Sequence, residues 1–266
     1  MTIHRHIRSL ALATDLALLE TRARIVDRGA YLVVETPDDP SYYYGNLLVL
    51  PAPPRAGEVA HWTQRFADEL GTRPEIRHVT LCWDGGVPDP AACDALVAAG
   101  FTLDPVVALA APSLRTPPAP PGIEIRPLDA SALPATAELA FALADRHDDV
   151  YRQFLQRRAA WQAGLVARGA AQFWGAFDGD RLVASLGLVT LAIGGARLGR
   201  FQDVQTAVDA RKRGIASALV GEAARAAALP SYVVIALPGG PALGLYERAG
   251  FAIVEHTASA CRYPAP

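Results

Sequence analysis

The sequence has few cysteines, no large excess of either charge and no long apolar run. Its three cysteines, Cys82, Cys93 and Cys261, are odd in number and lack metal-ligand spacing, which favours reduced thiols. The net charge of −2, from 25 basic and 27 acidic residues, gives no reason to expect a nucleic-acid partner. No segment approaches the ~20 apolar residues of a membrane span, and the charged start lacks the apolar core of a signal peptide. We therefore expect a cytoplasmic protein that binds no nucleic acid, membrane or metal.

Several motifs of common enzyme classes are also missing. The chain has no Gly-x-Ser-x-Gly elbow, no Gly-Lys-Ser/Thr phosphate loop and no Gly-x-Gly-x-x-Gly run, which argues against hydrolases, NTPases and dinucleotide-binding enzymes. What remains is a globular composition, 51% hydrophobic and 20% charged over 266 residues. That length suits two domains of about 100–150 residues each.

A proline-rich run divides the chain. Residues 112–122 read Pro-Ser-Leu-Arg-Thr-Pro-Pro-Ala-Pro-Pro-Gly, a composition typical of a stiff, extended connection. We therefore predict a first domain over residues 1–112, a linker over 113–121 and a second domain over 122–266.

Hydrophobic periodicity predicts the order β-α-α-β-β-β-α-β-α-β for the second domain, with a hairpin at Asp178-Gly179-Asp180. This order predicts a mixed, mostly antiparallel sheet with helices on both faces, which is an α/β fold of the α+β type. The first domain echoes the later part of this order, beginning with a strand predicted over 42–50. Residues 96–101 line up with residues 246–251, and both runs end in Ala-Gly-Phe. This suggests two tandem copies of one fold.

The run Arg211-Lys212-Arg213-Gly214-Ile215-Ala216 lies between a predicted strand and a predicted helix. Backbone N–H groups at a helix start are unpaired, and together with the helix dipole they can hold a phosphate or pyrophosphate. Gly214 has no side chain to block that approach. In the first domain the corresponding loop, residues 51–55, holds three prolines, which carry no N–H. The first domain is therefore predicted to be a degenerate copy.

Two motifs in the second domain resemble the GNAT superfamily of N-acetyltransferases. Arg211-x-x-Gly214-x-Ala216 fits the superfamily's acetyl-CoA pattern, Arg/Gln-x-x-Gly-x-Gly/Ala. Residues 242–251, Ala-Leu-Gly-Leu-Tyr-Glu-Arg-Ala-Gly-Phe, resemble its Ala-x-x-Leu-Tyr-x-x-x-Gly-Phe signature. The resemblance covers roughly residues 122–262 and includes the tandem arrangement of some bacterial members. It departs at Gly239, where relatives commonly carry an Asn that contacts CoA.

The resemblance implies acetyl-CoA as co-substrate and places residues around it. The backbone of Val204, Gln205 and Thr206 would pair with the pantetheine arm like an added strand. The pyrophosphate would lie on the backbone of six consecutive residues, Lys212, Arg213, Gly214, Ile215, Ala216 and Ser217. Tyr246 would protonate the leaving thiolate, a role that suits a hydroxyl with an ordinary pKa of about 10.

The attacking amine must lose a proton, because an alkylamine has a pKa of about 10.4. Asp203, on the strand that leads to the loop 211–216, is the first candidate base; its alternative role is a solvated or hairpin-paired acid. A water can also carry the proton. The implied activity is transfer of an acetyl group to a primary amine of a small molecule or peptide by direct attack, in a monomer or homodimer. The alternative is a non-catalytic acyl-CoA sensor or structural module.

Overall fold

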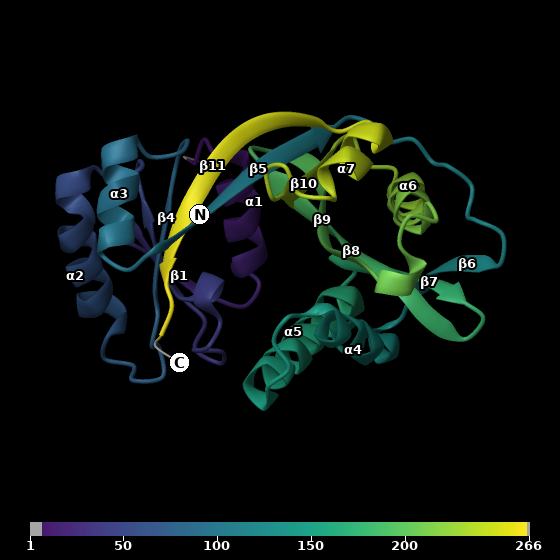
Figure 1. Cartoon of the computed structure of the whole chain (residues 1–266), viewed down its shortest axis with the longest axis horizontal. Coiled ribbons are helices and arrows are strands. Elements are labelled where there is room, and N and C mark those ends of the chain that lie inside the picture. The colour runs from purple at the N-terminus through teal and green to yellow at the C-terminus, as the bar shows by residue number, and fades with distance from the viewer. Residues whose placement is uncertain (1–6, 265–266) are drawn as a thin grey trace. The chain divides into compact units, whose positions relative to one another are not determined.

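The computed structural model describes residues 7–264 (Figure 1), and residues 1–6 of the charged start and residues 265–266 lie outside the described part. The chain forms two compact units. The first comprises residues 1–108 and 254–266, and the second comprises residues 109–253. Strands β5 (Thr102–Ala111) and β11 (Ala252–Arg262) each contribute residues to both units.

The first unit is a sheet with helices packed on both of its faces. Besides parts of β5 and β11, it contains α1 (Leu10–Leu19), β1 (Arg24–Asp27), β2 (Leu32–Glu35), β3 (Leu47–Leu50), α2 (Val59–Leu70), β4 (Val79–Trp83) and α3 (Pro90–Ala98). Strands follow the order β1-β2-β3-β4-β11, with β3 and β4 parallel and the other pairs antiparallel. Along β3, Leu48 and Leu50 face the core under α2 and α3, whereas Leu47 and Val49 face α1.

Residues 42–46 are not a strand, contrary to the sequence-based prediction. Residues Tyr43–Gly45 form a short 3-10 turn, and β3 begins only at Leu47. The side chain of Asn46 explains the turn, because its amide donates to the carbonyls of Asp39 and Tyr42. Its carbonyl oxygen accepts from the backbone N–H of Thr36. This side chain satisfies backbone groups that a strand would have paired.

The second unit confirms the predicted order and the mixed fold class. It contains β6 (Ile123–Leu128), α4 (Leu133–Leu143), α5 (Asp149–Ala167), β7 (Ala171–Asp178), β8 (Arg181–Ile193), β9 (Ala196–Thr206), α6 (Ile215–Ala227), β10 (Tyr232–Ala236) and α7 (Leu243–Ala249). Strands β6 to β9 are antiparallel, and β10 is parallel to β9. Helices α4 and α5 lie on one face of β7 to β9, and α6 lies on the other (Figure 1).

Local chemistry sets the limits of these elements. Asp148 caps α5 by accepting from the backbone N–H of Tyr151. Gly250 ends α7 in the left-handed conformation, with φ of 113°, which glycine adopts at no steric cost. Gly179 has φ of 59° in the turn between β7 and β8, at the predicted hairpin.

The proline-rich segment packs closely against α6 at Gly221. A Cβ added at Gly221 would lie 2.6 Å from the carbonyl oxygen of Arg115 and 2.7 Å from Cα of Thr116. Both atoms belong to backbone, so Gly221→Ala must displace a chain segment. We expect a loss of about 1–3 kcal/mol of unfolding free energy, measured by denaturant titration. Gly164→Ala in α5 is the control: its Cβ meets only the tip of the Arg168 side chain, and helix propensity favours Ala by up to ~1 kcal/mol. Equal changes of unfolding free energy in the two variants would contradict a close contact at Gly221.

Candidate active site

The second unit has an incomplete strand pairing at its centre. Parallel pairing of β9 and β10 joins Gly199 with Tyr232 and Arg200 with Val233, and no pairing beyond Arg200 occurs in the described chain. On its other edge, β9 stays paired with β8 as far as Thr206. The last residues of β9 therefore have one edge whose backbone groups face no strand. An extended ligand can use such an edge as an added strand would.

The loop after β9 leads into an open helix start. Gly214, at the N-cap of α6, has φ of 81°, and no side chain caps the helix. The first helical bond that the structure describes runs from the N–H of Ala218 to the carbonyl of Gly214. The N–H groups of residues 215–217 are thus available to an anion. An added Cβ at Gly214 would meet nothing within 4 Å, so the space beside it is open.

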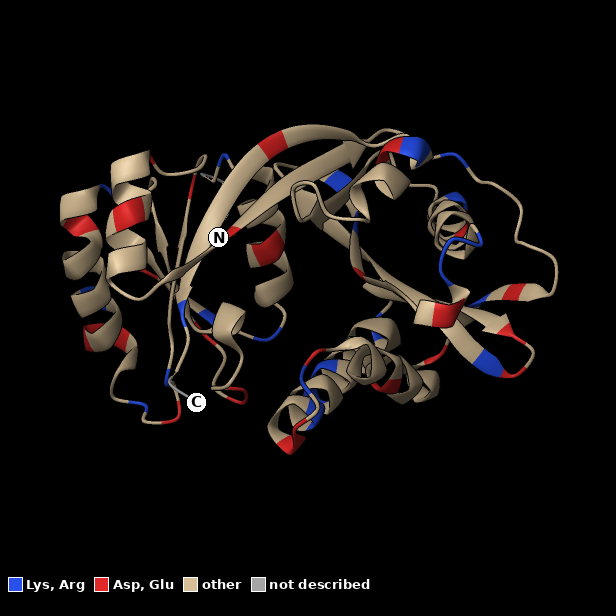
Figure 2. Ribbon diagram, in the orientation of Figure 1, with Lys and Arg blue, Asp and Glu red and all other residues tan. Residues whose placement is uncertain are grey.

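Lys and Arg residues of the chain are blue along the ribbon in Figure 2, and the three in this loop differ in the partners of their side chains. The Arg211 guanidinium donates to the carbonyl of Thr206, at 3.2 Å, and Arg213 pairs with Asp178, at 3.0 Å. Lys212 has no ion pair within residues 7–264 and holds a φ of 61°. Its ammonium is the group most readily turned toward a phosphate.

Tyr246 lies on α7 and is only 5% exposed. Burial raises the pKa of its hydroxyl to about 12, although the positive charge of Arg200 acts in the opposite direction. The hydroxyl is therefore protonated throughout the physiological range. The Tyr246 ring packs edge-on against Phe251, which in turn packs edge-on against Phe201 of β9. These ring contacts place Tyr246 on the α6 side of the sheet.

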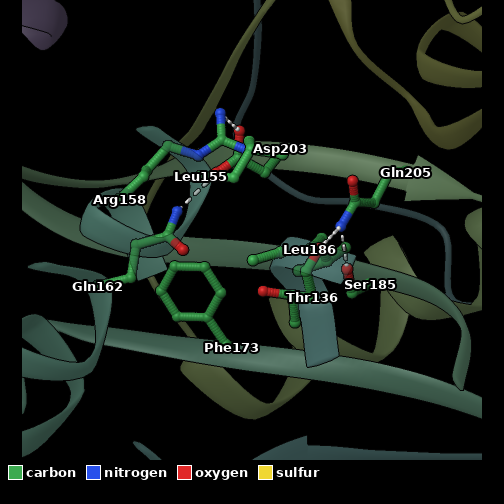
Figure 3. A pocket seen from close by; sticks show the side chains of 10 residues that line it. Thr136, Leu155, Arg158, Gln162, Phe173, Ser185, Leu186, Asp203 and Gln205 are labelled. Carbon is green, nitrogen blue, oxygen red and sulfur yellow. Dashed lines mark hydrogen bonds and ion pairs between the residues drawn. The ribbon is translucent and has the colours of Figure 1, made fainter. Parts of the chain in front are cut away.

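Asp203 occupies a bulge in β9. Between the pairs Gly187–Gln202 and Ser185–Gln205, β9 has one residue more than β8. Asp203 itself has φ of 49°, a conformation that Asp tolerates better than most residues. The bulge presents its carboxylate to α5, where Arg158 forms an ion pair at 3.1 Å and the Gln162 amide donates at 2.6 Å (Figure 3).

Beside this carboxylate lies a small cavity on the α4 and α5 side of the sheet. Its polar lining includes Thr136, Ser185 and Gln205, and its volume of about 10 Å³ suits a single water molecule (Figure 3). The Gln205 amide donates to the carbonyl of Thr136 at 2.9 Å and to the Ser185 hydroxyl at 2.8 Å. Polar groups thus occupy an interior position that apolar side chains usually fill.

The structure places most of the sequence-derived candidates in two groups and leaves Asp203 and Tyr246 apart from each other. Val204, Gln205 and Thr206 lie at the end of β9 where one edge has no strand partner, and residues 212–217 form the loop and first turn of α6. Asp203 and Tyr246 lie on opposite faces of β9. Sequence reasoning missed Arg158 and Gln162. Their spacing from Leu155, three and seven residues, puts all three on one helix face, so a polar pair on a buried face was the available signal.

None of the helices within residues 7–264 is long and apolar enough to cross a membrane. The same residues contain no group of three or more His, Cys, Asp or Glu side chains arranged to hold a metal ion.

Comparison with known proteins relates this geometry to a family. Residues 169–253 match the family model described as an acetyltransferase (GNAT) domain. None of the curated proteins matches the chain. The match includes β9, the loop between β9 and α6, α6 itself and Tyr246.

Solved structures share the fold at low identity. A functionally unknown conserved protein from Staphylococcus epidermidis ATCC 12228 aligns with a TM-score of 0.75 at 10% identity, over 91% of this chain and 95% of that one. A GCN5-related N-acetyltransferase from Kribbella flavida gives 0.63 at 16% identity, over 96% of both chains. Another from Sphaerobacter thermophilus gives 0.56 at 17%, over 89% and 81%. The family model thus identifies residues 169–253 as an acetyltransferase domain of the GNAT type, a domain of acyltransferases, and the solved structures show that the chain shares their fold.

Proposed function

We propose that the protein transfers an acetyl group from acetyl-CoA to a primary amine of a small molecule or peptide. The observation that carries the proposal is the uncapped N-terminus of α6. It follows, after one loop, the end of β9 where one strand edge has no partner. An acyl-CoA has an extended amide-bearing arm followed by a pyrophosphate, in that order. The protein offers an open strand edge followed by a helix start, in the same order.

The cofactor would bind mainly through the backbone. Val204, Gln205 and Thr206 pair with the pantetheine amides, and the N–H groups from Lys212 to Ser217 surround the pyrophosphate. The ammonium of Lys212 adds a counter-charge. Gly239, where relatives carry a CoA-contacting Asn, has φ of 68° in a tight turn, so the chain relies on the other contacts.

The reaction is a direct attack on the thioester. The amine nitrogen forms a bond to the acetyl carbon, and the carbon–sulfur bond breaks, leaving a thiolate. Tyr246 gives its proton to that sulfur, which suits a hydroxyl that burial keeps protonated. The proton of the attacking nitrogen passes to a water in the cavity beside Asp203 and from there to the carboxylate. An amide and free CoA are the products.

Two measurements on the full chain test this function. Isothermal titration with acetyl-CoA should give saturable binding, and a thiol-release assay over a panel of primary amines should give amine-dependent CoA formation. Binding without thiol release would favour the acyl-CoA sensor. Absence of binding would refute both functions.

Replacing Asp203 tests its role as base. Asp203→Asn should lower kcat at neutral pH by about tenfold, below the usual range for general bases because the relay also reaches bulk water. The difference in kcat between Asp203→Asn and the wild type should become smaller as the pH rises toward the amine's pKa of about 10.4, because the amine loses its proton unaided there. A pH–rate profile of both proteins measures this.

The control is Glu222→Gln, which removes an exposed carboxylate that pairs with Arg225 on α6. Its profile should match the wild type. A deficit in Asp203→Asn that stays constant with pH would indicate that Asp203 only orders Arg158 and Gln162.

The organisation of the chain is proposed as follows. The first unit is a degenerate copy of the second, since the order of three strands, helix, strand, helix and strand recurs along the chain. The loop after β3 in this copy contains three prolines and offers few N–H groups. We retain the boundary at residues 113–121, a cytoplasmic location and a monomer or homodimer as proposals.

A further inference from the structure

The proline-rich segment is tied to two helices of the second unit. It leads from β5 to β6 past α7 and α6 (Figure 1). The backbone N–H of Arg115 donates to the carbonyl of Ala249, at the end of α7, at 2.9 Å. The Thr116 hydroxyl donates to the carbonyl of Gly221 on α6 at 3.4 Å. These contacts hold the backbone of Arg115 beside both helices, although the residue itself is exposed.

A cavity of about 460 Å³ lies between this segment, the first turn of α6 and the end of α7. Its volume falls in the range of small-ligand sites, roughly 300–1,000 Å³. The lining residues are Arg115, Thr116, Pro117, Ser217, Arg248 and Ala249. Two of these six residues are arginines and none is acidic. A cavity with this lining suits an anion.

Both arginines retain N–H donors that the protein does not use. A guanidinium has five such donors, and one of those of Arg115 donates to the backbone carbonyl of Arg248 at 3.2 Å. Neither arginine forms an ion pair within residues 7–264, and the Ser217 hydroxyl has no partner there either. Arg225 of α6 differs, because it pairs with Glu222. The two arginines of the cavity therefore have no carboxylate to balance their charge.

Ser217 connects this cavity with the helix start to which we assign the pyrophosphate. Its backbone N–H is one of the unpaired groups of residues 215–217, and the same residue lines the cavity. In CoA the pyrophosphate is bonded to the 5′-oxygen of a ribose whose 3′-oxygen carries a phosphate monoester. Such a monoester has a charge of about −1.5 to −2 at pH 7. A second anionic group of the cofactor thus follows the pyrophosphate, as the basic cavity follows the helix start.

We propose that Arg115 and Arg248 bind the 3′-phosphate of acetyl-CoA in this cavity, so that the proline-rich segment supplies part of the cofactor site. This inference rests on the proposed function. A planar guanidinium presents pairs of N–H donors that match the spacing of phosphate oxygens. Acetyl-3′-dephospho-CoA has every other group of the cofactor and lacks only this phosphate.

Isothermal titration of the full chain with acetyl-CoA and with acetyl-3′-dephospho-CoA tests the inference. The readout is the ratio of the two dissociation constants. The wild type should bind acetyl-CoA about 30-fold more tightly, a modest preference because both arginines are exposed. Arg115→Gln and Arg248→Gln should each reduce the preference to about fivefold, with the affinity for the dephospho ligand unchanged. The double variant should bind both ligands equally.

Two further variants serve as controls. Arg115→Lys keeps the positive charge and loses the planar pair of donors, so its ratio should lie between those of the wild type and Arg115→Gln. Arg225→Gln removes an exposed arginine of α6 that does not line the cavity, and its ratio should equal that of the wild type. Both ligands are titrated into the same preparation, so a loss of folded protein in any variant leaves the ratio unchanged.

Equal affinity of the wild type for the two ligands would overturn the inference. It would also be overturned if Arg115→Gln weakened both ligands by the same factor, because Arg115 would then only hold the segment in place. Neither result would affect the proposed function, since acetyl-CoA would still bind. A wild type that binds neither ligand would refute the proposed function and the inference with it.

Discussion

Replacing Gly214 by Glu should weaken acetyl-CoA binding by about 100-fold or more, the equivalent of one or two hydrogen bonds to a charged group. The change places a carboxylate where the N–H groups of residues 215–217 would receive the pyrophosphate. It also forces a side chain onto a backbone whose φ is 81°. Isothermal titration of the folded variant measures the effect. Gly214→Ala, which adds strain and a methyl group but no charge, should give an intermediate loss.

Gly194→Glu is the matched control for this experiment. Gly194 also has a positive φ, of 58°, and also has nothing within 4 Å of an added Cβ. It lies in the turn before β9, at the other end of a strand that spans about 30 Å. The same strain and charge there should leave acetyl-CoA affinity unchanged. Similar losses in both variants would attribute the effect to stability and remove the support for a phosphate site.

Tyr246→Phe should lower kcat by about 100-fold while acetyl-CoA affinity stays the same. The ring and its edge-on contact with Phe251 remain, and only the proton donor is lost. Since burial raises the pKa of Tyr246 to about 12, the donor form is complete below that pH and is lost above it. Deprotonation of Tyr246 should therefore cause no fall in the wild-type rate between pH 7 and 10. A turnover equal to wild type would exclude the acid role.

Tyr232→Phe, in the same unit, should lower the stability of the protein without affecting catalysis. The Tyr232 hydroxyl donates to the carbonyl of Ala224 at 2.7 Å and accepts from the N–H of Leu229 at 2.9 Å. Losing it should reduce the unfolding free energy by about 1–3 kcal/mol. Because the residue is fully occupied in packing α6 onto β10, kcat should change little. A kcat loss as large as that of Tyr246→Phe would contradict this assignment.

The sequence predicted the structure best where a local pattern of residues is compatible with a single type of element. The alternation of residues 172–177 and 182–189 around Asp178-Gly179-Asp180 allowed only a hairpin, and the structure has one there. The strand Tyr232–Ala236 and the helix Leu243–Ala249, which ends at Gly250, also occupy their places in the predicted order of elements. The resemblance carried in residues 211–216 and 242–251 also agrees with the GNAT domain model that matches residues 169–253. These signals depend on contacts between residues close in the chain.

The remaining features depend on residues far apart in the chain. Gln162 reaches Asp203 over 41 positions, and no local pattern indicates that a glutamine on α5 will face a carboxylate. The side-chain Nε2 of Gln202 on β9 is buried without a hydrogen-bond partner among the described residues, and no local pattern indicates that either. The tyrosine run at 42–44 resembles a strand in composition, but the side chain of Asn46 takes over the backbone groups.

The return of residues 254–266 to the first unit has a consequence for the order of folding. Arg262 of β11 pairs with Val79 of β4, so a strand of the first unit is made some 180 residues after its partner. Ribosomal synthesis proceeds from the N-terminus, and during that interval the edge of β4 has no β11 beside it. The second unit, which is continuous in sequence, can complete its own contacts first. The half of the protein that is synthesised first is therefore expected to be the last to acquire its native hydrogen-exchange protection.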